Sequence, residues 1–424
     1  MSTPFLLVAY RLITAVIEPF APVLLRGRAR RGKEDLQRLG ERLGRAGAAR
    51  PDGPLVWLHG VSVGESLSLL PLVQALRRER PDIGILVTSG TQTSAALLAQ
   101  RLPPGAIHQY APVDGPRAVR RFLDHWRPDL AVFVESELWP NLLTEARRRG
   151  VKTTLLSAKL SQSSARTWSY APATVRFLLQ GFDLLLAQDE PAADRLVTFG
   201  VCADGLADLK FGADPLPVDA AALKAMKKRL AGRPVILAAS THPGEDEIVL
   251  ARFHSVLQTP GVAALNPLLV IAPRHPERGP AIAALAQDLT AGLQSAGSMA
   301  GDRQVYIADA LGELGLWYRL ARLAVIGGSL VEGLAGHNPL EPARLHCPFV
   351  SGPNISNWTT AFDELRLAEA TSIVDAAPAI DACFLAAIEG SDRLAAMADH
   401  AQAYVDRRDA EARAVPSLIL DLLP

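Results

Sequence analysis

The stretch HGVSVGES, residues 59 to 66, carries two side chains that could do chemistry. It follows the apolar run PLVWL and contains Gly-x-Ser-x-Gly, the pattern of a hydrolase nucleophile elbow, with Ser62 in the serine position. Glu65 lies one residue beyond the pattern, in the first turn of an expected helix, where the helix dipole favours its ionised form. An ionised carboxylate there can accept a proton from a sugar hydroxyl. The alternative is that Glu65 is only a charge at a helix N-terminus.

The hydrolase interpretation conflicts with the position of the pattern in the chain. A serine hydrolase needs an oxyanion hole from a loop after an earlier strand, and an Asp and a His on later strands. Histidines do follow, but the pattern comes after the first strand of its sheet, so no earlier strand can supply the oxyanion loop. We therefore expect Ser62 and Gly64 to shape a tight turn against a ligand, and Glu65 to carry the chemistry.

A pair of acidic residues ends a later apolar run, in VESELWPN at residues 134 to 141. Glu135 and Glu137 are two positions apart, so in extended geometry they share one face. Carboxylates at the carboxyl end of a strand are typical of functional sites, and solvated loop charges are the alternative.

Two strand ends in the second half of the chain carry groups that bind phosphate. In STHPGEDE, Ser240 and Thr241 could bind phosphate together with backbone amides, or act as ordinary helix caps. In APRHPER, Arg274 could form charge-assisted bonds to a phosphate. His275 has no second His or Cys at ligand spacing, so we expect no metal site there.

The richest motif is IGGSLVEGLAGHNPLEPARL, residues 326 to 345. A Gly-rich turn with Gly328 and Ser329 leaves a strand, Asn338 precedes a proline, and Glu341 begins a helix. This arrangement suits a nucleotide, with amides for its phosphate and a carboxylate for its ribose hydroxyls.

The motifs lie within two series of short apolar runs that alternate with amphipathic helical stretches. This alternation predicts an α/β fold of two Rossmann-like, doubly wound domains with a cleft between them. The expected strands of the first domain are 55–59, 83–89, 106–112, 130–136, 152–158 and 183–189, and those of the second are 233–240, 267–273, 304–309, 323–328, 348–352 and 371–375. The predicted divisions are an anchor helix with a basic stretch at 1–33, an N-terminal domain at 34–205, a linker at 206–218 rich in Gly, Asp and Pro, and a C-terminal domain at 219–424.

The composition excludes several classes of protein. The 424 residues have a formal net charge of zero, which argues against a nucleic-acid partner. The three cysteines are scattered without a Cys-x-x-Cys pair, which argues against a disulfide framework or a zinc site. The N-terminus differs from the rest: the apolar run from Phe5 to Leu25 is followed by RGRARRGK. We expect an uncleaved membrane anchor or monotopic helix whose basic residues meet anionic headgroups, and a helix packed on its own domain is the alternative.

The motifs HGVSVGES, ESELWPNL, LKFGADPLP, STHPGEDE, APRHPER, LGELG, GGSLVEG and GHNPLEPA occur in the order found in 3-deoxy-D-manno-octulosonic acid (Kdo) transferases, and the upstream RGKEDLQRLGERLG also resembles that family. The resemblance implies a GT-B glycosyltransferase that moves Kdo from CMP-Kdo onto a lipid A precursor. It further implies an inverting, metal-independent reaction without a cofactor, at the cytoplasmic face of a Gram-negative inner membrane.

The resemblance also assigns roles to individual residues. Glu65 matches the general base of the family, and Glu135 and Lys210 match residues that support the transition state. The CMP contacts that it implies are Pro273, Arg274, the backbone of Gly312, Glu313 and Leu314, and the run Asn338, Pro339, Leu340 and Glu341. Candidate contacts to the donor phosphate or carboxylate are Ser240, Thr241, Gly328 and Ser329, and candidate acceptor-side residues are Glu41, Ser62, Gly64, Glu137 and Lys159.

The chain departs from the family pattern at two places. Lys159 stands where an arginine is expected, which keeps the positive charge and loses bidentate geometry. Asp208 precedes the Leu-Lys pair and brings a carboxylate close to Lys210. The alternatives to a Kdo transferase are another GT-B nucleotide-sugar enzyme, such as an epimerase or a different glycosyltransferase, and a catalytically degenerate homologue that only binds lipid.

Overall fold

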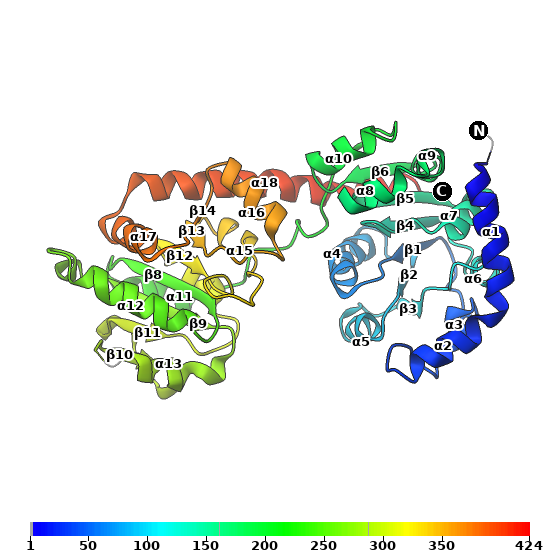
Figure 1. Ribbon diagram of the computed structural model, residues 1–424. Helices are drawn as coiled ribbons and strands as arrows, with labels where there is room; N and C mark the ends of the chain where they lie inside the picture. Colours follow the sequence, from blue (N-terminus) through cyan, green and yellow to red (C-terminus); the bar gives the residue numbers. More distant parts are fainter. Residues whose placement is uncertain (1–2, 161, 287) are drawn as a thin grey trace. The chain divides into compact units, whose positions relative to one another are not determined.

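The computed structural model describes residues 3–160, 162–286 and 288–424. It divides into two compact units, and each contains a seven-stranded, all-parallel sheet (Figure 1). Unit 1 comprises Met1–Ala213 and Arg408–Pro424, and unit 2 comprises Asp214–Arg407. The boundary at residue 213 falls inside the predicted linker.

The sheet of unit 1 reverses its strand order next to its first strand. Its strands are β1 (Leu55–His59), β2 (Gly84–Ser89), β3 (Ala106–Tyr110), β4 (Leu130–Val134), β5 (Lys152–Ala158), β6 (Leu184–Ala187) and β7 (Gly205–Leu206). The order β3-β2-β1-β4-β5-β6-β7 puts β1 directly beside β4. In such sheets the crevice at the carboxyl ends of the two strands where the order reverses is the usual place for a ligand.

Alternation along these strands builds a core on each face of the sheet. Trp57, Ala131 and Phe133 belong to one buried cluster, and their neighbours Leu58 and Val132 belong to another on the opposite face. The helices that cover the faces are α3 (Leu39–Arg42), α4 (Val63–Glu79), α5 (Gln92–Arg101), α6 (Pro116–Trp126), α7 (Pro140–Arg148), α8 (Gln162–Trp168), α9 (Pro172–Leu179) and α10 (Glu190–Val197).

Unit 2 repeats the architecture. Its strands are β8 (Val235–Thr241), β9 (Leu268–Pro273), β10 (Ala291–Leu293), β11 (Val305–Ile307), β12 (Leu323–Ile326), β13 (Phe349–Ser351) and β14 (Ser372–Ile373), in the order β10-β11-β9-β8-β12-β13-β14. The order reverses between β8 and β12. Its α-helices are α11 (Ala220–Leu230), α12 (Glu245–Leu257), α13 (Gly279–Leu285), α14 (Leu314–Tyr318), α15 (Leu340–Ala343), α16 (Thr359–Leu367) and α17 (Ala377–Glu389), with α18 (Asp392–Leu420) at the end. The predicted strands are all present, and β7 and β10 are additional.

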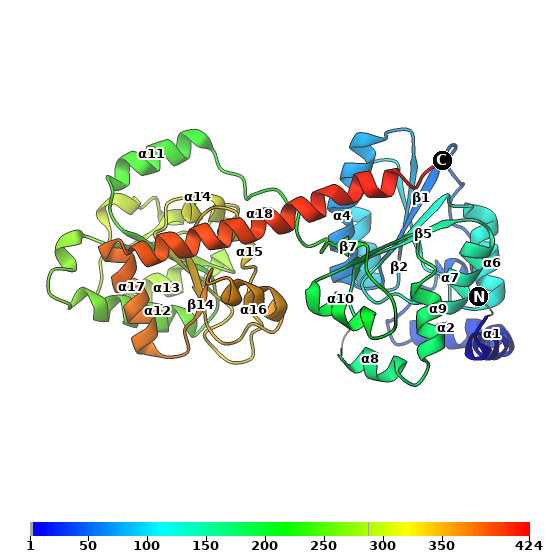
Figure 2. The ribbon, with the colours of Figure 1, turned by 90° about the horizontal axis from the view of Figure 1, so that it is seen from above.

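The last helix differs from the prediction. Residues up to Arg407 of α18 belong to unit 2, and the rest of the chain belongs to unit 1. Val415 and Ile419 are fully buried in the core that lies between β1 and α4, and Figure 2 shows this end of α18 beside α4. The predicted C-terminal domain of residues 219–424 therefore includes a segment, Arg408–Pro424, that packs with the N-terminal unit.

The N-terminal segment forms α1 (Phe5–Ile17), the 3-10 turn η1 (Glu18–Phe20) and α2 (Ala21–Ala29), and α1 runs along α6 and α7 (Figure 1). One face of α1 is bonded to unit 1: the Tyr10 hydroxyl donates to Asp114 Oδ2 (3.0 Å), and Thr14 Oγ1 accepts from Asn141 Nδ2 (2.9 Å). The Glu18 carboxylate accepts the amides of Arg117 and Ala118, at the start of α6.

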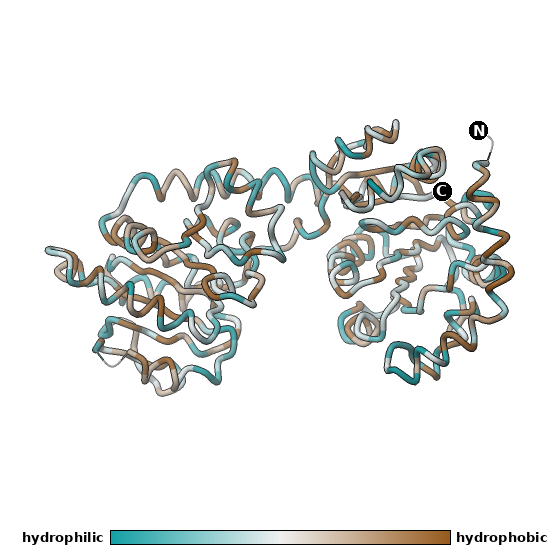
Figure 3. The backbone as a smooth tube through the Cα atoms, viewed as in Figure 1, coloured by the Kyte–Doolittle hydropathy of each residue, from teal (hydrophilic) through white to brown (hydrophobic). Residues whose placement is uncertain are grey.

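The other face of this segment is apolar and open. Its large exposed hydrophobic side chains are Phe5, Leu6, Val8, Leu12, Ile13, Val16, Ile17, Phe20, Val23 and Leu24, and Figure 3 shows hydrophobic colouring along α1. Among the described residues, Phe5–Ala29 is the helical segment long and apolar enough to cross a membrane, judged by length and composition. This segment can therefore anchor the protein to a membrane.

Candidate active site

The turn between β1 and α4 joins Ser62 and Glu65 in one hydrogen-bonded group. Ser62 is the N-cap of α4, and its Oγ accepts the Glu65 amide (3.2 Å) and donates to Glu65 Oε1 (2.7 Å). The Val61 amide donates to Glu65 Oε2 (2.7 Å). This is a reciprocal helix cap in which each carboxylate oxygen takes one hydrogen bond and keeps capacity for another. A Cβ at Gly60 would lie only 3.1 Å from the Glu65 Cβ, which explains the glycine before the turn.

Glu135 follows β4 in a left-handed conformation with φ of 57°. Its amide donates to Leu156 O (3.0 Å) and its carbonyl accepts the Lys159 amide (3.2 Å), so β5 holds this backbone on both sides. A left-handed residue other than glycine costs on the order of 1–2 kcal/mol, and such strain is concentrated at functional sites.

The charges around Glu135 come from three different loops. Burial raises the pKa of the Glu135 carboxyl; Lys210 opposes that shift, Glu65 adds to it, and Lys159 opposes it. The Glu65 and Glu135 turns meet because β1 and β4 are neighbours in the sheet. The structure thus brings together Glu65, Glu135, Lys159 and Lys210, four of the residues selected from the sequence.

Both lysines of this group are exposed. The Asp208 carboxylate accepts the Lys210 amide (2.9 Å) and Gln188 Nε2 (2.9 Å). Asp208, a departure from the family pattern, therefore serves to shape the loop that presents the Lys210 ammonium.

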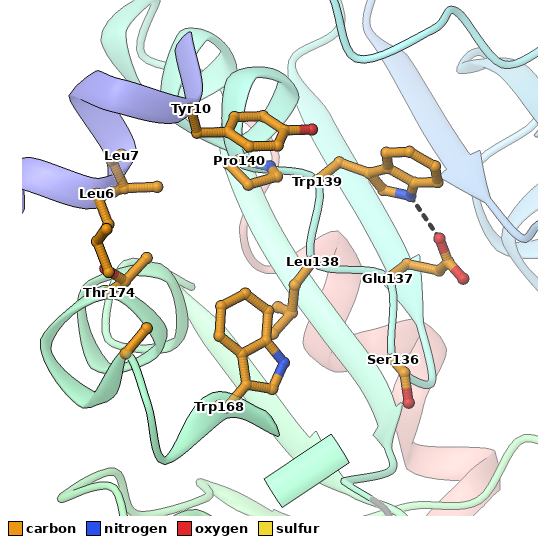
Figure 4. A pocket seen from close by; sticks show the side chains of 11 residues that line it. Leu6, Leu7, Tyr10, Ser136, Glu137, Leu138, Trp139, Pro140, Trp168 and Thr174 are labelled. Carbon is orange, nitrogen blue, oxygen red and sulfur yellow. Dashed lines mark hydrogen bonds between the residues drawn. The ribbon is translucent and has the colours of Figure 1, made fainter. Parts of the chain in front are cut away.

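Glu137 lies apart from Glu135, and the predicted shared face of the two carboxylates does not form. The reason is that Glu135 adopts a left-handed φ instead of extended geometry. Glu137 Oε2 accepts Trp139 Nε1 and lies 3.7 Å from His59 Nε2, and Figure 4 shows its carboxylate beside the Trp139 ring. His59 is fully buried and its Nδ1 pairs with Thr88 Oγ1 (2.8 Å).

Glu41, which was selected as a candidate acceptor-side residue, has internal hydrogen-bond partners in this structure. Its side chain is buried and receives both Arg38 Nε (2.8 Å) and Arg38 Nη2 (2.9 Å), and the Tyr110 amide donates to Oε2 (2.7 Å). These bonds fasten the segment before β1 to the end of β3, and they leave the carboxylate little capacity for a ligand.

The Gly-rich turn of unit 2 already holds an anion, the side chain of Glu245. The Glu245 carboxylate is fully buried and accepts four backbone amides, those of His242 (2.8 Å), Gly328 (2.7 Å), Ser329 (2.8 Å) and Leu330 (2.8 Å). The amides of Gly328 and Ser329, which were predicted as contacts to the donor, are therefore engaged by the chain's own carboxylate in this structure.

The hydroxyl groups near this turn are similarly occupied. Thr241 is buried and donates to Asp246 Oδ1 (2.6 Å), and Ser329 Oγ donates to Ile326 O (2.5 Å). The Thr241 hydroxyl, a predicted phosphate contact, thus has an internal acceptor in this structure. Ser240 stays half-buried at the strand end with φ of 58°.

The other predicted donor contacts surround the ends of β9, β11 and β12. Pro273 ends β9, and the Arg274 side chain that follows is exposed. Burial raises the pKa of Glu341, which is opposed by a hydrogen bond from Asn338 Nδ2 (3.4 Å) and by the charges of Arg344 and Arg274. Asn338 Oδ1 accepts the amide of Leu340 (3.0 Å), after Pro339, at the start of α15.

The remaining predicted contacts form the turn before α14. Gly312 has φ of 86°, a conformation that favours glycine, and Glu313 and Leu314 follow it as the N-cap and first residue of α14. Gln294 Nε2 donates to Glu313 Oε1 (2.6 Å), which fixes this side chain against the end of β10.

Sequence reasoning missed a histidine pair beside this half of the site. His242 Nε2 and His337 Nε2 are 2.9 Å apart and their rings are stacked. Burial lowers the pKa of both rings, and the neighbouring Arg274 charge also lowers it. Two neutral rings at this distance must adopt opposite tautomers, so that one donates and the other accepts. Only the shared position of the two histidines after neighbouring strands could have indicated the pair.

Across residues 3–160, 162–286 and 288–424, no group of three or more His, Cys, Asp or Glu side chains is arranged to hold a metal ion. The positive charges near the site come from lysine and arginine side chains.

Comparison with known proteins identifies close sequence relatives. Residues 37–213 match the family model described as 3-Deoxy-D-manno-octulosonic-acid transferase (kdotransferase). The chain is 34% identical over 355 residues to the 3-deoxy-D-manno-octulosonic acid transferase of Rickettsia bellii, which covers 82% of this chain and 83% of the relative. It is 36% identical over 356 residues to the enzyme of that name from Bordetella pertussis, with 80% and 81% covered.

Comparison with solved structures identifies the fold. UDP-GlcNAc 2-epimerase from Neisseria meningitidis, bound to UDP-GlcNAc, matches with a TM-score of 0.54 at 14% identity, which covers 87% of this chain and 99% of that one. A glycosyltransferase from Rickettsia africae matches with a TM-score of 0.53 at 12% identity, with 88% and 99% covered. At these identities the likeness concerns the fold alone, and it confirms the predicted pair of Rossmann-like domains of the GT-B class.

Proposed function

Because the chain belongs to the 3-deoxy-D-manno-octulosonic acid (Kdo) transferase family, we propose that it moves Kdo from CMP-Kdo onto a glucosaminyl hydroxyl of a lipid A precursor, with inversion and with Glu65 as the general base. The enzyme is a glycosyltransferase of lipopolysaccharide biosynthesis. The observation that carries the proposed mechanism is the geometry of Glu65, a carboxylate fixed by two hydrogen bonds and close enough to Glu135 to affect the pKa of that residue.

A general base must be ionised, fixed and open to its proton donor. The first turn of α4 favours the ionised carboxylate, and the Val61 amide and Ser62 hydroxyl fix its two oxygens. In the reaction Glu65 accepts the proton of the sugar hydroxyl while the hydroxyl oxygen bonds to the anomeric carbon of Kdo. The bond from that carbon to the phosphate oxygen breaks, and CMP leaves with the electron pair. Attack opposite the departing phosphate inverts the anomeric centre.

Positive side chains stabilise the charge that develops in this step. Lys210 and Lys159 lie close enough to Glu135 to affect its titration, and the proposed role of Glu135 is to orient them toward the Kdo carboxylate. On unit 2 the exposed Arg274 pairs with the CMP phosphate, and the half-buried Glu341 accepts ribose hydroxyls. No step in this scheme requires a metal ion, and we expect activity to persist in excess EDTA.

The N-terminal segment supports the proposed location at the cytoplasmic face of the inner membrane. Because Tyr10, Thr14 and Glu18 bond one face of α1 and η1 to unit 1, the opposite apolar face is left for the lipid. The basic residues that follow would contact anionic headgroups; they are Arg26, Arg28, Arg30, Arg31 and Lys33.

The decisive test is incubation of the full chain with CMP-Kdo and a tetra-acylated lipid A precursor, followed by mass spectrometry of the lipid. An increase by one or more Kdo masses is expected, and the number of increments gives the number of sugars transferred. An unchanged lipid mass alongside an active control transferase contradicts the assignment. The serine hydrolase alternative predicts that Ser62→Ala is inactive and Glu65→Gln active, and our proposal predicts the reverse.

A further inference from the structure

Unit 1 contains an apolar pocket whose wall includes the N-terminal helix. The pocket has a volume of about 500 Å³, within the usual range for small-molecule sites. Three parts of unit 1 line it (Figure 4). Helix α1 contributes Leu6, Leu7 and Tyr10, and the segment from the end of β4 to the start of α7 contributes Ser136, Glu137, Leu138, Trp139 and Pro140. The α8–α9 region contributes Trp168, Ala171 and Thr174. Hydrocarbon and aromatic groups make up most of this surface.

One end of the pocket continues into the open apolar face of α1. Leu7 is buried against the unit 1 core, and its neighbour Leu6 is 50% exposed while it lines the pocket. Phe5 beside it is 81% exposed and belongs to the face that is left for the membrane. A hydrocarbon chain can therefore pass from a bilayer along Leu6 into the pocket without crossing a charged surface.

The other end reaches the loop that carries Glu135. Ser136 and Glu137 line the pocket, and the preceding Glu135 is the residue that senses the charges of Glu65 and Lys210. Glu137 is the one charged side chain among the described lining residues, and Trp139 and His59 already engage it. The pocket thus offers little to a charged or polar ligand, although it adjoins a site that acts on a polar sugar.

We propose that this pocket binds one acyl chain of the lipid acceptor and so places the sugar hydroxyl at Glu65. The proposal rests on the transferase function argued above and adds the part of the acceptor that unit 1 recognises. Each methylene that the pocket buries contributes about fourfold to affinity, so even partial occupation by a chain changes the acceptor KM more than tenfold.

Pocket variants test this with two acceptors, the tetra-acylated lipid A precursor and its fully deacylated bisphosphorylated disaccharide. Ala171→Trp fills the pocket from a half-buried position, and Trp168→Ala removes a wall. We expect each to raise the ratio of the acylated to the deacylated acceptor KM at least tenfold. The matched control is Tyr170→Ala, which removes an aromatic side chain that is 88% exposed on the same segment and should leave the ratio unchanged. An unchanged ratio in both folded pocket variants overturns the proposal.

A cross-linking experiment on the wild-type protein decides the question if the variants fail to fold. A diazirine at the end of one acyl chain of the acceptor should label Trp168 or Leu138 on irradiation, and excess unlabelled acceptor should suppress that labelling. Labels confined to Phe5, Leu12 and Val16 would show that the chain stays in the bilayer and would overturn the proposal. Failure of the proposed function looks different, because then neither acceptor gains Kdo in any variant.

Discussion

Substitution of Glu65 by glutamine separates its two roles, as the cap of α4 and as the proposed base. In the native turn Glu65 Oε2 accepts the Val61 amide and Oε1 accepts the Ser62 hydroxyl, each at 2.7 Å. A glutamine oxygen can replace the first acceptor, and its amide can donate to Ser62 Oγ, so both contacts keep a partner. The glutamine cannot take up the proton of the sugar. We expect kcat to fall about 10²- to 10⁴-fold, the usual contribution of general base catalysis.

The matched variant Glu65→Ala removes both the base and the cap. It leaves the Val61 amide and the Ser62 hydroxyl without their carboxylate, a loss of about 1–2 kcal/mol in the free energy of unfolding. For a unit of this size that corresponds to a fall in Tm of roughly 2–8 °C. Glu65→Gln should lower Tm by less than about 2 °C. The two variants should therefore share the same low kcat and differ in Tm.

The assay is the initial rate of the increase in lipid mass, measured together with Tm. Ser62→Ala serves as the control, because it removes the N-cap and one bond to Glu65 but keeps the base. Its kcat should fall no more than about tenfold, through loss of orientation alone. The base assignment would be refuted if Glu65→Gln kept more than roughly a tenth of the wild-type kcat, or if Ser62→Ala were the less active of the two.

Three further substitutions test other parts of the structure. Burial raises the pKa of Glu135, so its ionisation costs more in the folded than in the unfolded protein, and stability is lost as the pH rises above the usual glutamate range. Glu135→Gln should therefore raise Tm by roughly 2 °C at pH 8 and not at pH 4, while it lowers kcat; a Tm gain that does not depend on pH contradicts this reasoning. Glu245→Gln places an NH₂ donor against backbone amides that donate to the native carboxylate, and should lower the free energy of unfolding by about 3 kcal/mol, measured by chemical denaturation. Loss of CMP binding without loss of stability would indicate a ligand contact instead. Glu18→Ala should lower Tm by about 2–4 °C because it removes the acceptor of two α6 amides, and an unchanged Tm would mean that this cap contributes nothing to the stability of unit 1.

The fold could be predicted from the sequence because both sheets are built from long, fully buried strands. Runs such as LVWLH and LAVFV permit few other structures, and helical stretches lie between them. The short strands β7 and β10 were missed because their residues, Gly-Leu and Ala-Gly-Leu, contain a glycine and lack the β-branched or aromatic residues that indicated the other strands. The end of α18 was placed in the wrong unit because an amphipathic stripe shows that a helix is buried without showing against what.

The candidate site was selected from charged side chains that follow strands in the sequence. The loops of Glu65 and Glu135 meet because β1 and β4 are neighbouring parallel strands, and Lys210 lies close enough to affect the pKa of Glu135. The internal partner of the Gly-rich turn at Gly328 could not be predicted, because backbone amides donate to any anion of suitable shape and a buried carboxylate of the chain itself can engage them. The pattern of glycines alone cannot distinguish an internal from an external anion. The internal partners of Glu41, Arg38 and the Tyr110 amide, were equally impossible to predict from the sequence.

The passage of α18 from one unit to the other has a consequence for engineering and for evolution. Since Arg408–Pro424 supplies buried side chains to unit 1, a gene cut once near residue 213 yields an N-terminal piece that lacks part of its own core. Exchange of unit 2 between relatives therefore requires two junctions, one near residue 213 and one near residue 407. A single recombination event would leave the first unit with a C-terminal segment from another parent, and compatibility at Val415 and Ile419 would decide whether that hybrid folds.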